Sequence, residues 1–226
     1  MRAAKRTNTK KDKTIKLKKV LTVANIQNQS ITRLDWSGEF LNAFGRPQDR
    51  GLWFVWGDSG SGKSSFVMQL AKAMSCMFPT LYNLLEEEPD DSDYIDRTKL
   101  FNMQDVKDNF HTANYTTLKE LDAYCEKRNS KKVIIIDSIV YLTKDWDAWF
   151  AFKKKWEKKK ILIVVGHAKG KNPKTEFEDK IMFDAKMKIF ITGYLAICKG
   201  RTIGKNGGKY IVFQEGYEKL RGAESA

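Results

Sequence analysis

The decisive stretch of the chain reads Gly57-Asp58-Ser59-Gly60-Ser61-Gly62-Lys63-Ser64. It fits the pattern G-x-x-x-x-G-K-[S/T] at every position, and Ser65 follows it. Glycines let a backbone wrap closely around a phosphate, and the N–H groups of the loop and of the next helix face the anion. The pattern predicts a loop that binds a nucleoside triphosphate, with Lys63 on the β- and γ-phosphates and the Ser64 hydroxyl on Mg²⁺.

The sequence on both sides of this loop supports the prediction. Residues 52–56 are a short apolar run, as expected of a buried strand. Residues 63–77 carry apolar side chains at helical spacing, and Pro79 ends the pattern. A chance match in a glycine-rich turn would not have a strand before it and a helix after it.

Apolar strands and helices continue to alternate along the chain. We predict further strands at residues 80–85, 133–136, 161–165, 188–192, 194–199 and 210–213. We predict further helices at residues 102–109, 116–128 and 144–160, and loops at 86–96 and 169–180. Residues 192–195 are expected to form a simple bend, and the glycine-rich turn 200–208 joins the last strand pair. This order predicts an α/β fold with a mainly parallel central sheet covered by helices and an antiparallel C-terminal strand pair.

A second magnesium ligand is expected at the end of another strand. Residues 133–136 are four apolar residues, and Asp137 follows them. In such folds the carboxyl ends of the strands lie beside the phosphate loop. We expect Asp137 to hold the metal through water, and the alternative is an aspartate that only caps its strand.

The chain resembles the RecA-like ATPases, which include RecA and RadA recombinases, DnaB-type helicases and KaiC. The resemblance covers roughly residues 35–215 and begins with the phosphate loop. Three further motifs carry it: Leu81-Tyr82-Asn83-Leu84-Leu85-Glu86-Glu87, Ile135-Ile136-Asp137-Ser138-Ile139 and Ile163-Val164-Val165-Gly166-His167.

The resemblance implies roles for the residues at these strand ends. A glutamate in the place of Glu86 or Glu87 polarises the attacking water in this family. The choice between the two stays open, because a shift of one residue at a strand end exchanges which side chain points inward. His167 stands where the family has a residue that senses the γ-phosphate and signals to a DNA-binding loop, here residues 169–180.

A basic pair near the C-terminus resembles another element of the family. Lys199-Gly200-Arg201 is similar to the Lys-x-Arg pair that DnaB-type and KaiC-type subunits insert into a neighbour's nucleotide site. Cations there would stabilise charge on the γ-phosphoryl oxygens. The resemblance therefore implies a homo-oligomer, a ring or a filament, and the alternative is a basic turn without this role.

Positive charge is concentrated at the N-terminus. The net charge of the chain is +13, and residues 1–20 hold nine basic side chains and one acid. This polar segment lacks aromatic residues, so we expect a flexible tail at 1–20 and a single RecA-like ATPase domain at 21–226. A cationic arm gains affinity for nucleic acid by releasing counterions, and the alternative is a solubilising tail.

Two further features are interpreted as structural. Residues 144–160 interleave aromatic side chains with lysines, which suits either base stacking or a helix packed on a sheet; the helical spacing favours packing. Three scattered cysteines, Cys76, Cys125 and Cys198, indicate a reducing environment, and no apolar run is long enough for a membrane helix.

Together these features predict an ATP hydrolase that uses ATP and Mg²⁺ and acts as an oligomer on DNA in recombination, replication or transposition. The short chain resembles small RecA-like ATPases of phages and mobile elements, which implies a bacterial cytoplasm and a possible recombination or replication partner. An alternative is a nucleotide-gated scaffold or loader for a helicase or transposase, with little turnover. A metabolic kinase is disfavoured, because the chain shows no arginine-rich lid.

Overall fold

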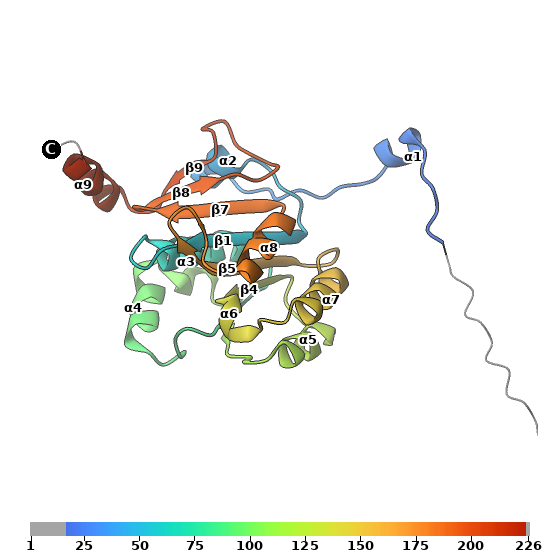
Figure 1. Cartoon of the computed structure of the whole chain (residues 1–226), viewed down its shortest axis with the longest axis horizontal. Coiled ribbons are helices and arrows are strands. Elements are labelled where there is room, and N and C mark those ends of the chain that lie inside the picture. Colours follow the sequence, from blue (N-terminus) through green and yellow to red (C-terminus); the bar gives the residue numbers. More distant parts are fainter. Residues whose placement is uncertain (1–16, 225–226) are drawn as a thin grey trace, which may run out of the picture. The chain divides into compact units, whose positions relative to one another are not determined.

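A computed structural model describes residues 17–224 of the chain (Figure 1). The chain divides into two units, Met1–Ile31 and Thr32–Ala226. In the described part of the first unit, the short helix α1 (Val23–Gln27) begins at a capping box formed by Thr22 and Asn25. Most of the basic tail predicted for residues 1–20 lies outside the described residues. All other elements belong to the second unit.

Nine strands form the sheet within the described residues. They are β1 (Gly51–Gly57), β2 (Thr80–Leu84), β3 (Phe110–Ala113), β4 (Val133–Asp137), β5 (Ile161–Lys169), β6 (Asn172–Pro173), β7 (Met187–Thr192), β8 (Leu195–Cys198) and β9 (Lys209–Ile211). Their order is β3-β2-β4-β5-β1-β7-β8-β9, and β6 pairs with β5. The pairs from β3 to β7 are parallel, whereas β8 and β9 are antiparallel, so the predicted fold class is confirmed.

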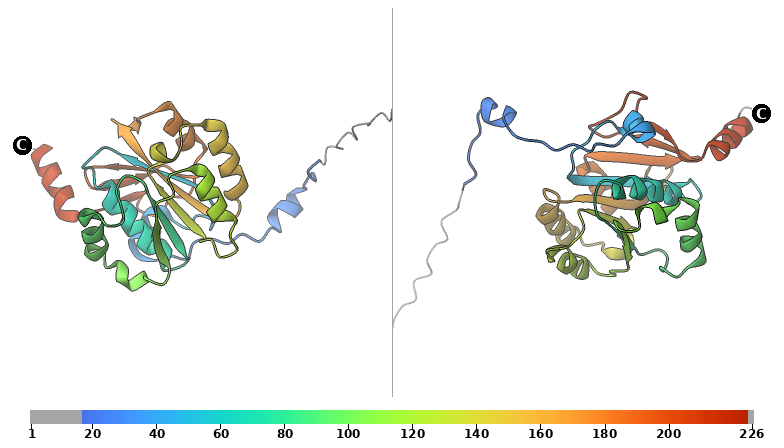
Figure 2. Two further views of the ribbon diagram at one scale, coloured as in Figure 1. Left: turned by 90° about the horizontal axis from the view of Figure 1, so that it is seen from below. Right: turned by 180° about the vertical axis from the view of Figure 1, so that it is seen from behind.

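Helices cover both faces of the sheet (Figure 2). One face packs against α2 (Gly38–Phe44), α3 (Lys63–Ser75), α4 (Ser92–Leu100) and the 3₁₀ helix η1 (Met103–Val106). The other face packs against α5 (Leu118–Glu126), α6 (Ile139–Leu142), α7 (Trp146–Trp156) and α8 (Glu176–Asp184). Strands β1 and β4 are buried along their whole length, which explains their nearly continuous apolar sequences.

The parallel arrangement brings the carboxyl ends of the central strands to one edge. Gly57 at the end of β1 is the register partner of His167 in β5 and of Ile191 in β7. Leu84 at the end of β2 is paired in the same way with Asp137 at the end of β4. Motifs that are far apart in the sequence therefore meet beside the phosphate loop.

Several local predictions were wrong. The segment 86–96 is not entirely a loop, because α4 begins at Ser92. The segment 169–180 is not an open loop either: it makes a tight turn into β6 and then enters α8. Three further elements were not predicted from the sequence: β3 and α6, which are short, and the last helix α9 (Gln214–Glu224), which is mostly polar.

The aromatic residues of α7 serve mainly to pack the helix onto the sheet. Trp149, Phe152 and Trp156 are buried, and the indole nitrogen of Trp156 donates to Asp122 at 2.6 Å. Lys153 is also buried and pairs with Asp184 at 2.6 Å. These contacts favour the packing interpretation of residues 144–160 over base stacking. Among residues 17–224, no helix has the length and apolar character needed to cross a bilayer.

Candidate active site

The phosphate loop lies between β1 and α3, where its glycines permit close approach. Gly62 has φ of 89°, and a Cβ at this position would lie 2.7 Å from Cδ1 of Tyr194. A Cβ at Gly57 would lie 2.6 Å from the carbonyl oxygen of Ile191. Only glycine fits both positions, so the loop can fold tightly over the N-terminus of α3.

A cavity of about 370 Å³ opens in front of this loop. It is lined by Asp58, Ser59, Gly60, Gly62, Lys63, Ser64, Ser65, Glu86, Arg97, His167 and Tyr194. The structure thus brings most of the predicted loop residues together with Glu86 and His167. Gly57, Ser61, Glu87 and Asp137 are not among the lining residues.

The loop presents groups suited to an anion. Lys63 is only 8% exposed, and its Nζ lies 3.4 Å from the carbonyl oxygen of Gly166. The Ser61 hydroxyl is buried and has no hydrogen-bond partner among the described residues. Unsatisfied buried donors and the N-terminus of α3 favour a phosphate here. The residues present therefore fit the triphosphate that the sequence predicts.

The structure separates the two glutamates at the end of β2. Oε1 of Glu86 lies 2.9 Å from Nε2 of His167, and Glu86 lines the cavity. Glu87 instead accepts two hydrogen bonds from Arg97, both of 2.9 Å. A bidentate pair of this kind holds both partners firmly. Of the two acids, Glu86 therefore faces the phosphate loop.

Asp137 is buried at the end of β4, and the hydroxyl of Tyr82 donates to its Oδ2. Burial is the largest cause that raises the pKa of Asp137 to about 6; the hydrogen bond from Tyr82 and the charge of Lys63 oppose it, and the charge of Glu86 adds to it. A carboxylate and the Ser64 hydroxyl are oxygen donors of the kind that Mg²⁺ prefers. No group of three or more His, Cys, Asp or Glu side chains in residues 17–224 could hold a metal unaided, so phosphate oxygens would have to complete the site.

His167 stands between two acids at the end of β5. Its Nε2 faces Glu86, and its Nδ1 lies 3.8 Å from Oε1 of Glu178 on α8. The ring of Tyr141 meets the imidazole edge-on, with centroids 6.5 Å apart. The histidine thus lines the cavity, and Glu178 and Tyr141 lie against its ring.

The basic pair near the C-terminus lies outside this cavity. Lys199 is exposed and lines a separate cavity with Asp58 and Lys171. Arg201 is also exposed, and its backbone N–H bonds to the carbonyl of Lys186, just before β7. Strand β8 runs antiparallel to β7, so the backbone of this pair lies away from the edge that holds the phosphate loop, whereas the Lys199 side chain shares its cavity with Asp58 of that loop.

Two residues of the cavity were missed from the sequence. Arg97 comes from α4 and lies one residue after the stretch 86–96 that was predicted to be a loop. Tyr194 has φ of 56°, its backbone N–H bonds to the Ser61 carbonyl, and its ring meets that of Phe213. The only local signal for Tyr194 is the glycine before it, from which the sequence predicts no more than a plain bend.

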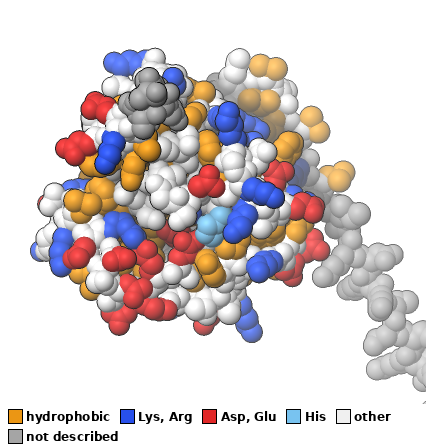
Figure 3. Space-filling view, turned by 60° about the vertical axis from the view of Figure 1, so that its left-hand side comes forward, with side chains coloured by type: hydrophobic (Ala, Val, Ile, Leu, Met, Phe, Trp, Pro, Cys, Tyr) orange, Lys and Arg blue, Asp and Glu red, His pale blue; other side chains and the backbone are white. Residues whose placement is uncertain are grey.

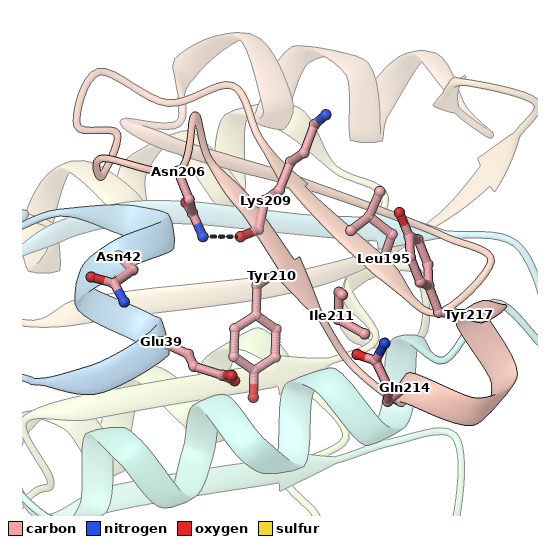
Figure 4. Close-up of a pocket in the computed structure, with 9 residues that line it drawn as sticks. All are labelled: Glu39, Asn42, Leu195, Asn206, Lys209, Tyr210, Ile211, Gln214 and Tyr217. Atoms are coloured by element: carbon pink, nitrogen blue, oxygen red, sulfur yellow. Dashed lines mark hydrogen bonds between the residues drawn. The ribbon is translucent and has the colours of Figure 1, made fainter.

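A larger cavity of about 500 Å³ lies around the sheet edge at β9, where Figure 4 shows its lining side chains. Tyr210 lies between α2 and α3, and its hydroxyl donates to Gln69. Burial is the first cause that raises the pKa of Tyr210 to about 12, with the charge of Glu39 second. None of the residues predicted to bind nucleotide lines this cavity, so the cavity at the phosphate loop is the candidate site.

The chain matches no protein-family model and no curated protein. Solved structures are similar to it in fold. The flagellar accessory protein FlaH from Methanocaldococcus jannaschii aligns with a TM-score of 0.57 and 20% identity, over 80% of this chain and 92% of that one. A KaiC-like protein from Pyrococcus horikoshii aligns with a TM-score of 0.58 and 16% identity, over 80% of this chain and 100% of that one. At these identities the likeness concerns the fold alone: this chain has an α/β fold like that of FlaH and of the KaiC-like protein.

Proposed function

We propose that this protein is a Mg²⁺-dependent ATPase whose reaction takes place at the phosphate loop. The observation that carries the proposal is the convergence in one cavity of Lys63, the loop backbone and Glu86. The loop that would bind the triphosphate follows β1, whereas Glu86, the acid that would act on water, follows β2. A loop that only bound phosphate would not require an acid facing it.

The binding roles follow from the positions of the side chains. Lys63 and the loop N–H groups would hold the β- and γ-phosphates, while Ser64 and Asp137 would hold Mg²⁺, the latter through water. Mg²⁺ bound by these two residues would supply positive charge beside the phosphates. Arg97 and Tyr194 line the same cavity and would contact the bound nucleotide.

The hydrolytic role falls to Glu86. A water oxygen would attack the γ-phosphorus while one of its protons passes through Glu86 to the released phosphate; the bond to the β–γ bridging oxygen breaks, and ADP keeps the electron pair of that bond. Glu86 would orient this water, because it is the acid that faces the loop. His167 would hold the carboxylate in place through the 2.9 Å contact between its Nε2 and Oε1 of Glu86.

The buried carboxylate of Asp137 leads to a test in the protein without divalent cations. Because burial raises its folded-state pKa to about 6, the ionised form is unfavourable in the folded protein. We expect Asp137→Asn to stabilise the metal-free protein by about 2 to 3 kcal/mol above pH 7. The gain should shrink as the pH falls through about 6, since the folded protein then binds the proton. Chemical denaturation from pH 5 to 8 measures it. If Asp137→Asn leaves the stability at pH 8 unchanged or lowers it, the ionised carboxylate of Asp137 is not unfavourable in the folded protein.

Oligomerisation is proposed from the position of Lys199 and Arg201. Both are exposed, and neither lines the cavity of its own chain, as expected if they act on a neighbouring subunit. The complementary cavity around Glu86 would then belong to the next subunit of a ring or filament.

Mixing two inactive variants tests this arrangement. Glu86→Gln subunits keep their basic pair, and Lys199→Ala/Arg201→Ala subunits keep their acid. A mixture should recover about a quarter of wild-type turnover under random pairing, because one interface in four joins the two intact halves. Each variant mixed with itself is the control. Turnover no higher than in these controls would assign catalysis to a single subunit.

A role on DNA is proposed from the charge of residues 1–20, which have a net charge of +8. Figure 3 shows acidic and basic side chains interspersed on the face it draws, so that face is not a continuous basic surface. The concentration of nine basic side chains in residues 1–20 makes the tail our candidate for an electrostatic contact with nucleic acid. Recombination, replication or transposition are the settings that such an ATPase would serve.

The experiment that tests the function compares steady-state ATP turnover with and without single-stranded DNA. We expect DNA to stimulate turnover in the full chain, and deletion of residues 1–20 to weaken this stimulation without lowering the basal rate. The deletion should also reduce the slope of log affinity against log salt, by about 0.7 for each DNA phosphate that the tail neutralises. A low rate that is indifferent to DNA would favour the alternative, a nucleotide-gated scaffold.

A further inference from the structure

A buried carboxylate lies directly behind the candidate active site. Glu178 on α8 has 0% of its surface exposed. Its Oε1 accepts the backbone N–H of His167 at 2.8 Å, and its Oε2 accepts the backbone N–H and the hydroxyl of Thr175 at 3.0 and 2.7 Å. Burial of a carboxylate is unfavourable unless donors compensate it, and these three donors do so.

Helix capping alone does not explain this burial. Glu178 forms a capping box with Thr175, and Glu120 forms the same box with Thr117 at the start of α5. Glu120 is exposed, so a capping box in this chain does not need a buried acid. Glu178 differs because its carboxylate also reaches β5.

The backbone of β5 is shaped to admit this carboxylate. A Cβ at Gly166 would lie 2.9 Å from Oε1 of Glu178 and 2.6 Å from Cζ of Phe54. A larger residue would displace the acid from the strand. The absence of a side chain at Gly166 therefore lets the buried carboxylate of Glu178 accept the backbone N–H of His167.

The imidazole of His167 consequently stands between two acids with different surroundings. Nε2 is 2.9 Å from Glu86, which lines the nucleotide cavity, and Nδ1 is 3.8 Å from the buried Glu178. The 3.8 Å separation is too long for a hydrogen bond to the ring, so Glu178 holds His167 through the backbone N–H at 2.8 Å, and its charge lies on the Nδ1 side of the imidazole. We infer that Glu178 is a positioning residue: it holds His167 so that the imidazole fixes the carboxylate of Glu86 toward the phosphate loop. This inference rests on the proposed ATPase function.

The first test is Glu178→Gln, with Glu120→Gln as the matched control. Glutamine has the same shape but brings N–H donors, so it cannot accept all three hydrogen bonds. Orienting partners of histidines in metal sites contribute about 10- to 100-fold. We expect Glu178→Gln to lower kcat about tenfold while KM for ATP changes less than about twofold, because the loop that binds the phosphates is untouched. Glu120→Gln loses only a cap and should keep its kcat.

Two more variants separate positioning from a structural effect. Thr175→Val removes the hydroxyl on Oε2 but leaves the link from Oε1 to His167, so it should keep most of the turnover. In a His167→Ala background, Glu178→Gln should lower kcat no further, because the two residues act through one path. Equal losses in Thr175→Val and Glu178→Gln, or additive losses with His167→Ala, would overturn the inference. Glu178→Asp, which keeps the charge but shortens the reach, replaces Glu178→Gln if that variant does not fold.

A spectroscopic test does not depend on turnover. The chain has two histidines, so the ring signals of His167 can be assigned in NMR spectra with a His111→Gln variant. We expect the His167 ring signals to shift in Glu178→Gln and to stay unchanged in Glu120→Gln, with thermal unfolding confirming that both fold. Unchanged His167 signals in Glu178→Gln would overturn the positioning role. If the wild type hydrolyses no ATP, the proposed function fails. The NMR comparison still shows in that case whether Glu178 positions the ring of His167.

Discussion

Replacing Lys63 with alanine is expected to lower ATP turnover by at least about 100-fold, the loss seen when a fixed charge that stabilises a transition state is removed. Lys63 is buried at the phosphate loop and is the only lysine that lines this cavity among the described residues. Its loss would leave the charge that spreads over the γ-phosphoryl oxygens without its main protein partner. Binding should suffer as well, since the ammonium would contact the ground-state phosphates.

Nucleotide-dependent stabilisation measures the binding part of this effect. At about 100 times its Kd, Mg-ATP should stabilise the wild type by about 2.7 kcal/mol, which corresponds to a rise in Tm of about 5 to 10 °C for a domain of this size. This rise should be lost in Lys63→Ala. Turnover and Tm shift are then compared in the same preparation.

Lys72→Ala is the matched control. Lys72 lies on the same helix α3, pairs with Asp105 at 2.7 Å and does not line the cavity. It should lose a little stability and keep both turnover and the nucleotide-dependent rise in Tm. If Lys63→Ala kept turnover within a few-fold of the wild type, the reaction would have to take place elsewhere in the protein.

The second large effect is expected from Glu86→Gln. An amide cannot accept a proton or orient water as a carboxylate does, and groups in this role contribute about 10² to 10⁴ in rate. We expect kcat to fall by at least about 100-fold while the affinity for Mg-ATP stays near that of the wild type. Single-turnover hydrolysis and calorimetric titration separate the two quantities.

Glu87→Gln is the natural comparison, because it makes the same change one residue later. Glu87 is held by Arg97 in a partly buried pair. Losing one charge of this fork should lower the free energy of unfolding by about 1 to 2 kcal/mol and affect turnover much less. The opposite result, with turnover lost in Glu87→Gln and kept in Glu86→Gln, would transfer the role of water orientation to Glu87.

Sequence patterns predicted the sheet well where single strands are buried on both faces. Residues 52–56 and 133–136 are apolar without interruption, and β1 and β4 contain them. Elements with little buried apolar surface were not predicted. Strand β3 is short and only half-buried, and α9 is mostly polar, so neither presents an apolar run that stands out in the sequence.

The phosphate-loop motif and the alternation of strands and helices could be predicted from the amino-acid sequence, because both depend on neighbours along the chain: glycines that permit a tight turn, and apolar runs that need burial. Tertiary contacts were needed to show that Glu86 rather than Glu87 faces the loop, since that choice depends on Arg97 from α4 and on His167 from β5. The same is true of Glu178, whose place behind His167 comes from the packing of α8 against β5. These contacts join elements that are far apart in the sequence. They depend on how the helices pack on the sheet, and a local sequence pattern contains no information about that packing.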